Sequence, residues 1–135
     1  MPADFFHVLH VSADGLAAER MRVDLSAQNL ANAETTRTPG GGPYKRLDPV
    51  FAATVDEAGS TTVKVAEVKE DQSAPKKVYL PGHPDADADG FVTLPNVDPV
   101  NEVVNLLSAQ RGYEANTTAI DTTKTMAQRA LEIMK

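Results

Sequence analysis

The sequence of 135 residues contains no cysteine and no tryptophan, and only 5% of its residues are aromatic. The absence of cysteine excludes disulfide bonds, thiolate zinc sites and cysteine nucleophiles. Acidic residues outnumber basic ones by 19 to 13 and no region is basic, so binding to nucleic acid or to an anionic membrane surface is not expected. No apolar run approaches the ~20 residues that span a membrane, which argues against direct membrane insertion. The first basic residue is Arg20, so the positively charged opening of a secretory signal peptide is missing.

Proline and glycine are concentrated in the middle of the chain. Eight of the nine prolines and six of the eight glycines fall in residues 39–99, whereas the two flanks hold one glycine each. Because both residue types interrupt helices, the flanks are expected to be helical and the middle is not. We therefore divide the chain into an N-terminal helix in residues 1–34, an extended loop and small β module in residues 35–98, and a C-terminal helix in residues 99–135.

The C-terminal flank has the pattern of a long helix. Asp98 is a suitable N-cap, and Pro99 is favoured in a first helical turn. From there a 3-4 spacing that is typical of a coiled-coil seam continues for more than four heptads. Its positions are Leu106, Tyr113, Ile120, Ala127 and Met134, interleaved with Val103, Gln110, Thr117, Lys124 and Leu131. A helix over residues 99–134 would be roughly 54 Å long. A compact globule of this size is only ~37 Å across, so we expect an elongated molecule.

The N-terminal flank repeats this pattern, and a helix is expected over residues 4–33. One apolar stripe has a seven-residue spacing, and its members are Leu9, Leu16, Val23 and Leu30. A second stripe lies on a neighbouring face and consists of Val11, Ala18, Met21 and Leu25. Two stripes on one helix indicate contacts with more than one neighbour.

The middle segment has the alternating and β-branched character of short strands in residues 44–55, 62–68, 77–80 and 91–94. The fold class is therefore predicted to be α+β, with two long terminal helices that pack as an elongated coiled-coil core and a small β-rich module inserted between them. Many positions of the helical stripes are Ala, Thr or Gln, so one helix pair buries little apolar surface. The free energy of that burial is small compared with the entropic cost of ordering the backbone of both helices. We expect the remaining stabilisation to come from neighbouring molecules, as in a subunit that orders when it polymerises.

Both flanks carry motifs that resemble a known family. The run Asn29-Leu30-Ala31-Asn32 with Thr35-Thr36 resembles the N-terminal motif of the bacterial flagellar rod and hook protein family. The runs Arg111-Gly112-Tyr113-Glu114-Ala115-Asn116 and Thr123-Lys124-Thr125-Met126 resemble its C-terminal motif. The passage over residues 37–46, which includes Pro43 and Tyr44, is similar to the proximal-rod members of that family.

The resemblance implies a structural subunit of the proximal rod, the drive shaft that transmits torque across the periplasm, with no catalytic residues and no cofactor. It also implies export without a cleaved signal by the flagellar type III export apparatus. The implied partners are the other proximal and distal rod proteins, the hook–basal-body adaptor protein and further copies of the chain itself.

The motif residues carry over as packing residues. Asn29, Asn32 and Asn116 would hydrogen-bond across the helix seams or at their ends, and Tyr113 would fill an inter-helix seam. The full set expected to serve assembly and packing is Leu9, Leu16, Val23, Asn29, Leu30, Asn32, Thr35, Thr36, Pro43, Tyr44, Val103, Leu106, Arg111, Tyr113, Asn116, Ile120, Ala127 and Leu131.

Some residues suggest metal or phosphate sites, but each has a simpler interpretation. The run Asp85-x-Asp87-x-Asp89-Gly90 matches the first half of an EF-hand loop, but its twelfth position is Asn96 and not a glutamate. We expect an acidic, solvated turn there. His7, His10 and Asp14 fall on one side of a helix, and with His83 they could supply zinc ligands. We expect an exposed polar face instead. Residues 40–42 are three glycines without the Gly-Lys-Ser/Thr ending of a P-loop, and are interpreted as a flexible connection.

No catalytic constellation is found, so the chain is not expected to be an enzyme. Two other functions remain open from the sequence. One is a soluble coiled-coil adaptor that binds a single partner instead of polymerising. The other is a Ca²⁺-binding module centred on residues 85–90.

Overall fold

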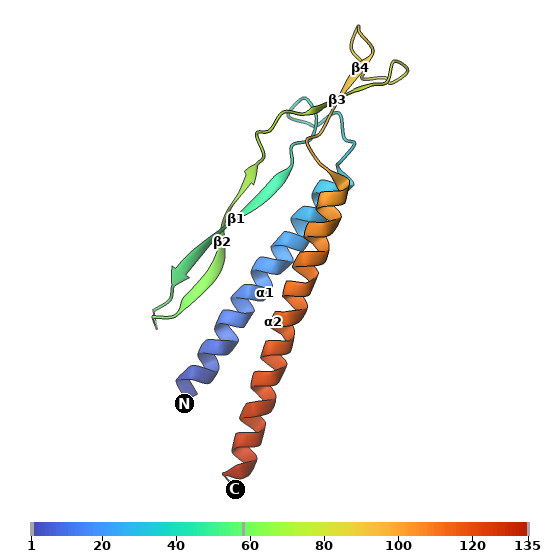
Figure 1. Cartoon of the computed structure of the whole chain (residues 1–135). Coiled ribbons are helices and arrows are strands. Elements are labelled where there is room, and N and C mark those ends of the chain that lie inside the picture. The colour runs from blue at the N-terminus through green and yellow to red at the C-terminus, as the bar shows by residue number, and fades with distance from the viewer. Residues whose placement is uncertain (1, 58, 135) are drawn as a thin grey trace.

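The computed structural model describes residues 2–57 and 59–134 as an elongated molecule (Figure 1). Two long helices lie side by side and run antiparallel, so that the chain termini lie at the same end. Both β-hairpins belong to the segment that connects the helices. The predicted α+β class, the long terminal helices and the elongated shape are confirmed. The elements in chain order are α1 (Pro2–Ala31), β1 (Leu47–Val55), β2 (Thr61–Glu70), β3 (Lys76–Tyr79), β4 (Phe91–Leu94) and α2 (Pro99–Ile133).

The ends of the two helices follow from local chemistry. Asp98 is the N-cap of α2, where its Oδ1 accepts a hydrogen bond of 3.0 Å from the backbone N–H of Val100. Pro99 occupies the first turn, where its missing N–H costs nothing. At the other helix, Asn32 follows the last residue of α1 and its Nδ2 donates to the carbonyl of Gln28 over 2.9 Å, which satisfies one carbonyl of the final turn.

The strands lie close to where the sequence predicts them, but they form two separate hairpins rather than one module. β1 pairs with β2 in an antiparallel sheet with an irregularity between Val50 and Phe51. β3 pairs with β4 in a second antiparallel sheet. The β1–β2 hairpin extends back along α1 (Figure 1). Ala18 and Leu25, from the second apolar stripe of α1, are buried. Helix α1 therefore contacts two neighbours, α2 and the hairpin, as its two stripes predict.

The core is small and nearly half of its buried residues are polar. The buried apolar residues are Ala18, Leu25, Val92, Pro95, Val97 and Ala109, and the buried polar or charged residues are Ser12, Ser26, Asn29, Thr62 and Glu102. Within residues 2–57 and 59–134, neither helix combines the length and apolarity of a membrane span.

Candidate functional site

Small residues let α1 and α2 approach each other closely. Gly15 on α1 faces Asn116 on α2, and a Cβ at Gly15 would lie 2.9 Å from the Asn116 Oδ1. Gly112 on α2 faces Glu19 on α1, and a Cβ there would lie 2.7 Å from the Glu19 Cδ. Ala109, one turn earlier on α2, is completely buried. Both glycines therefore leave space that a polar side chain of the other helix occupies.

The polar side chains over the glycines form hydrogen bonds within their own helices. Arg22 Nη1 donates a 2.9 Å hydrogen bond to Glu19 Oε2. Asn116 Nδ2 donates to the carbonyl of Gly112 over 3.0 Å. The hydrogen bond of Asn116 thus runs within α2, and a bond across a seam or at its end stays a prediction for the assembled rod.

The seam between α1 and α2 is displaced by one residue from the predicted register. On α2 it follows Glu102, Ala109, Gly112 and Asn116, whereas the prediction gave Val103, Gln110, Tyr113 and Thr117. On α1 it follows Gly15, Glu19 and Asn29. Of these, Gly15 and Asn29 lie one residue before the predicted stripe positions Leu16 and Leu30. One residue is about 100° around a helix. Some large side chains of the predicted stripe, such as Val103 and Tyr113, therefore lie beside the seam and are exposed, whereas Leu106 and Ile120 are half-buried.

Several of these displaced side chains are exposed. Val103 is 41% exposed, Tyr113 43% and Leu131 64%. Tyr113, expected to fill an inter-helix seam, lines an open groove of about 580 Å³ between the helices of the single subunit. The other residues that line this groove are Arg20, Val23, Asp24, Gln110 and Glu114. A second exposed apolar patch covers the first turns of α2 and consists of Val100, Val103, Val104 and Leu107.

Asn29 joins α1 to the start of the β1–β2 hairpin through its side-chain amide. Its Nδ2 donates to the carbonyl of Leu47 over 2.8 Å, and its Oδ1 accepts from the N–H of the same residue over 2.8 Å. The Oδ1 also accepts from the Tyr44 hydroxyl at 2.9 Å. The Asn29 side chain is buried and Leu47 is half-buried, so Asn29 satisfies both backbone groups of Leu47 at a place that is partly closed to water.

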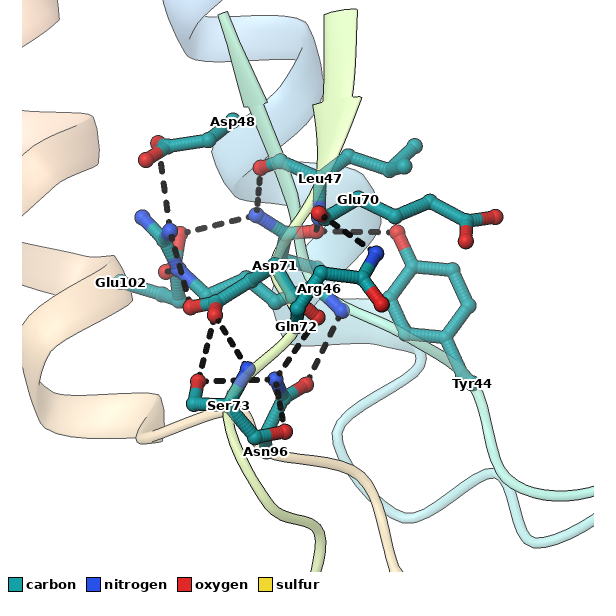
Figure 2. Close-up of polar contacts among 11 residues, drawn as sticks. Tyr44, Arg46, Leu47, Asp48, Glu70, Asp71, Gln72, Ser73, Asn96 and Glu102 are labelled. Carbon is teal, nitrogen blue, oxygen red and sulfur yellow. Dashed lines mark hydrogen bonds and ion pairs between the residues drawn. The ribbon is translucent and has the colours of Figure 1, made fainter.

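Glu102, in the first turns of α2, completes this joint from the other helix (Figure 2). It is 1% exposed, and its carboxylate accepts from Arg46 Nε and, over 3.4 Å, from Asn29 Nδ2. Arg46 also pairs with Asp48 at 3.2 Å. Burial alone would lower the pKa of Arg46, but its hydrogen bonds to Glu102 and Asp48 outweigh burial and raise that pKa. Burial, and then the nearby Glu102 charge, raise the pKa of Tyr44. The buried charge is thus paired, which is the condition for tolerating it.

Asn96 fixes the end of β2 and the approach to α2 at the same joint (Figure 2). Its Oδ1 accepts from the N–H of Arg46 at 3.1 Å. Its Nδ2 donates to the carbonyls of Asp71 and Ser73 and to the Ser73 Oγ. Hydrogen bonds from the Ser73 side chain and backbone lower the pKa of Asp71. Four segments that are distant in the sequence therefore meet in one polar cluster, which we call the polar joint: Asn29, Tyr44, Arg46, Leu47, Asp71, Ser73, Asn96 and Glu102.

The acidic run over residues 85–90 is engaged by protein groups. Asp85 forms an ion pair with Arg37, and its Oδ2 accepts from the Thr36 hydroxyl at 2.6 Å. The hydrogen bond from Thr36, together with the Arg37 charge, lowers the pKa of Asp85. Asp87 Oδ1 accepts from the backbone N–H groups of Asp89 and Phe91. These carboxylates therefore hold a turn between β3 and β4 and tie it to the loop that follows α1.

The three histidines have different surroundings. His83 Nδ1 accepts from the N–H of Asp85 at 3.0 Å. His10 Nδ1 lies 3.8 Å from Asp14 Oδ2 and 3.8 Å from Asp56 Oδ2. His7 is exposed. In the described ranges, no three His, Cys, Asp or Glu side chains form a group that could hold a metal ion.

The other predicted packing residues occupy three kinds of position. Asn32 and Thr35 cap the end of α1, with the Thr35 hydroxyl donating to Asn32 Oδ1 at 3.1 Å. Arg111 is exposed on α2. The half-buried ones are Leu9, Leu16, Val23, Leu30, Thr36, Pro43, Leu106, Ile120 and Ala127.

Sequence reasoning missed Arg46, Asn96 and Glu102, which hold the polar joint together. Arg46 and Glu102 are 56 residues apart, and no local period connects such positions. A single acidic residue inside the apolar start of α2, between Val100 and Val103, is the one signal that could have pointed to Glu102.

Comparison with known proteins identifies the family. Residues 88–133 match the family model described as the C-terminal region of flagellar basal body rod FlgEFG proteins. The flagellar basal-body rod protein FlgC of Salmonella typhimurium is 44% identical, over 94% of this chain and 96% of its own length. FlgC of Bacillus subtilis is 42% identical, over 96% and 98% of the two chains. FlgC of Borreliella burgdorferi is 40% identical, over 96% and 97%. The chain therefore belongs to the FlgC family of flagellar basal-body rod proteins, and it is a structural, non-enzymatic subunit of the basal-body rod.

Proposed function

We propose that the subunit polymerises within the proximal part of the rod through the large apolar side chains that its own helix pairing leaves exposed. The observation that carries this proposal is the displaced seam. α1 and α2 close on Gly15, Ala109 and Gly112, and large apolar side chains such as Leu107 and Leu131 remain exposed to other molecules.

The exposed side chains offer substantial free energy to an assembly. Leu107 is 52% exposed and Leu131 is 64% exposed. Full burial of a leucine contributes about 1.5–3 kcal/mol, so each of these residues retains roughly 1–2 kcal/mol for a contact with another subunit. Exposed apolar surface of this extent is a recognised mark of protein interaction sites.

The groove between α1 and α2 fits the apolar edge of a third helix. Val23 and Tyr113 supply its apolar lining, and Arg20, Asp24 and Glu114 place both signs of charge around them. Coiled-coil bundles use this arrangement, in which apolar knobs fill the centre and flanking charges select the partner and its direction. A helix from a neighbouring subunit is therefore the occupant that we propose.

The division of the chain follows from the same contacts. Residues 1–34 and 99–135 form the axial core that makes the inter-subunit contacts, and residues 35–98 form the peripheral part that the polar joint fixes to it. Torque would pass from subunit to subunit through interlocked side chains, because a smooth apolar contact allows helices to slip. The other rod proteins, the hook–basal-body adaptor protein and the export apparatus that delivers the chain are the partners that this position requires.

A pair of matched substitutions on α2 tests the proposal. Tyr113→Asp places a charge in the groove, and Thr122→Asp places the same charge at an exposed position on another face of the helix. Asp has a helix propensity close to those of Tyr and Thr, so the two variants should have similar helix content as free monomers. We expect Tyr113→Asp to abolish swimming in a strain that lacks the chromosomal gene and to leave no assembled rod in purified basal bodies. Thr122→Asp should restore both.

Normal rods with Tyr113→Asp would refute the role of the groove. A soluble adaptor that binds one partner would instead give a complex of fixed stoichiometry with that partner and no incorporation into purified rods.

A further inference from the structure

The end of α2 extends past the start of α1 (Figure 1). The register of the two helices is given by three facing pairs: Gly15 with Asn116, Glu19 with Gly112, and Asn29 with Glu102. The residue numbers of each pair add to 131, so Pro2 at the start of α1 lies opposite Arg129. Among the described residues, the last turn of α2, from Ala130 to Ile133, therefore has no residue of α1 beside it.

This unpaired turn carries large apolar side chains in contact with solvent. Ile133 is 85% exposed and Met134, the C-cap residue, is 83% exposed, the highest values for large apolar residues in the described part of the chain. Leu131 is exposed as well. A helical turn without a packing partner is only marginally stable in water. The end of α2 therefore needs a cover that its own subunit does not supply.

The groove between α1 and α2 matches this turn in length. It is lined on α1 between Arg20 and Asp24 and on α2 between Gln110 and Glu114, which is about one helical turn on each side. The subunit cannot fill this groove with its own α2 end, because Tyr113 and Ile133 are separated by roughly 30 Å along one rigid helix.

The groove and the end of α2 also carry complementary charges. The groove has one net negative charge, from Arg20, Asp24 and Glu114. Residues 124–134 have one net positive charge, from Lys124, Arg129 and Glu132. Within the described ranges, none of these six side chains forms an ion pair in the free subunit. Both sets of charges are therefore available to a contact between molecules, where complementary charges fix the partner and its register.

We propose that the groove of one subunit receives the end of α2 from a second copy of the chain. This inference rests on the proposed function, because it names the partner of the same groove. Ile133 and Met134 enter beside Val23 and Tyr113, and Arg129 lies among the acidic residues of the rim. The contact joins two different surfaces, so each pair of copies keeps one free groove and one free α2 end. Such a heterologous contact can repeat from copy to copy.

Disulfide trapping tests this contact, because the chain has no cysteine of its own. One copy carries Gln110→Cys at the groove and another carries Ile133→Cys at the end of α2. A strain that lacks the chromosomal gene produces both copies, and its purified basal bodies are oxidised and analysed on a non-reducing gel. We expect a covalent dimer, since a disulfide requires Cβ atoms within about 4.5 Å of each other. The dimer should be lost when Thr122→Cys, at an exposed position on another face of α2, replaces Gln110→Cys.

A second pair, Glu114→Cys with Leu131→Cys, covers the case in which one substitution blocks assembly by itself. Absence of the dimer with both pairs would overturn the inference, and so would an equally strong dimer with Thr122→Cys or a dimer formed with Val104→Cys in place of Gln110→Cys. If the dimer is absent while Tyr113→Asp still blocks assembly, the proposed function stands and the groove holds a helix of another rod protein. If the dimer is absent and Tyr113→Asp gives normal rods, both proposals fail.

Discussion

Replacement of Asn29 should lower the free energy of unfolding by far more than the small size of its side chain suggests. Its amide contacts both backbone groups of Leu47 over 2.8 Å and accepts from the Tyr44 hydroxyl at 2.9 Å. Asn29→Ala removes all of these bonds together and leaves the N–H and C=O of Leu47 without partners beside the buried Glu102. Each such group costs about 1–3 kcal/mol when it is sequestered from water. Leu47 is only half buried, so the lower part of that range applies to each.

The expected total is a loss of about 2–4 kcal/mol in the free energy of unfolding, as two or three such groups lose their partners. For a chain of this length that loss lowers the Tm by roughly 10 °C. Urea unfolding followed by far-UV circular dichroism measures it, since the chain has no tryptophan for a fluorescence signal. Gln28→Ala, at the exposed neighbouring position, is the matched control and should change stability by less than about 0.5 kcal/mol.

Asn29→Asp distinguishes the hydrogen-bond argument from a simple loss of packing. It keeps the oxygen that accepts from Leu47 and Tyr44, but it replaces the amide donor with a second oxygen. That oxygen faces the Leu47 carbonyl and also Glu102 Oε2, which lies 3.4 Å from the Asn29 Nδ2 in the wild-type chain. At neutral pH this variant should therefore be destabilised at least as much as Asn29→Ala. Its deficit should shrink as the pH falls toward about 4, because burial and the Glu102 charge raise the pKa of the new carboxyl above its ordinary value and a protonated carboxyl can donate again. Equal stabilities for Asn29→Ala and Gln28→Ala would refute the reasoning.

Three further outcomes are expected. Asp98→Ala removes the cap of α2 and should cost about 1 kcal/mol in the same urea experiment; no loss would mean that the cap is replaced by solvent. Gly112→Ala should be neutral or stabilising by up to ~1 kcal/mol, because alanine is the better helix former and the obstructing atoms are the flexible end of Glu19; a loss of more than about 1 kcal/mol would show that Glu19 is rigidly held. Asp85→Asn should make the free energy of unfolding less sensitive to acid. The folded chain holds the pKa of Asp85 below its ordinary value. The ionised Asp85 therefore stabilises the fold above that ordinary pKa, and this contribution is lost as the pH falls through the lowered pKa. Thermal melts of Asp85→Asn and wild type at pH 6 and pH 2.5 check this, and equal acid-induced losses would contradict it.

The sequence predicts the elements well because each has a local signal. Asp98-Pro99 marks the start of α2, and the confinement of proline and glycine to the middle separates helices from strands. Strand pairing is less accessible. Nothing in the four strand-like runs indicates that β3 pairs with β4 alone, because pairing depends on where the chain turns in space.

The register of the helix seam could not be predicted, for a physical reason. Hydrophobic periodicity follows the largest apolar residues, such as Tyr113, whereas small residues, Gly15, Ala109 and Gly112, lie at the contact between the helices. The polar joint escaped prediction for another reason. Arg46 and Glu102 meet only after the helices have paired, and ion pairs between distant residues leave no periodic trace in a sequence.

The most direct test of the central claim is the helix content of the dilute monomer, measured by far-UV circular dichroism and compared with that of assembled rods. The structure has 30 helical residues in α1 and 35 in α2. If the helix pair depends on neighbouring subunits, the monomer at micromolar concentration should show clearly fewer than these 65 helical residues and should gain the difference on assembly. The full helical signal in a dilute monomer, unchanged on assembly, would contradict the account.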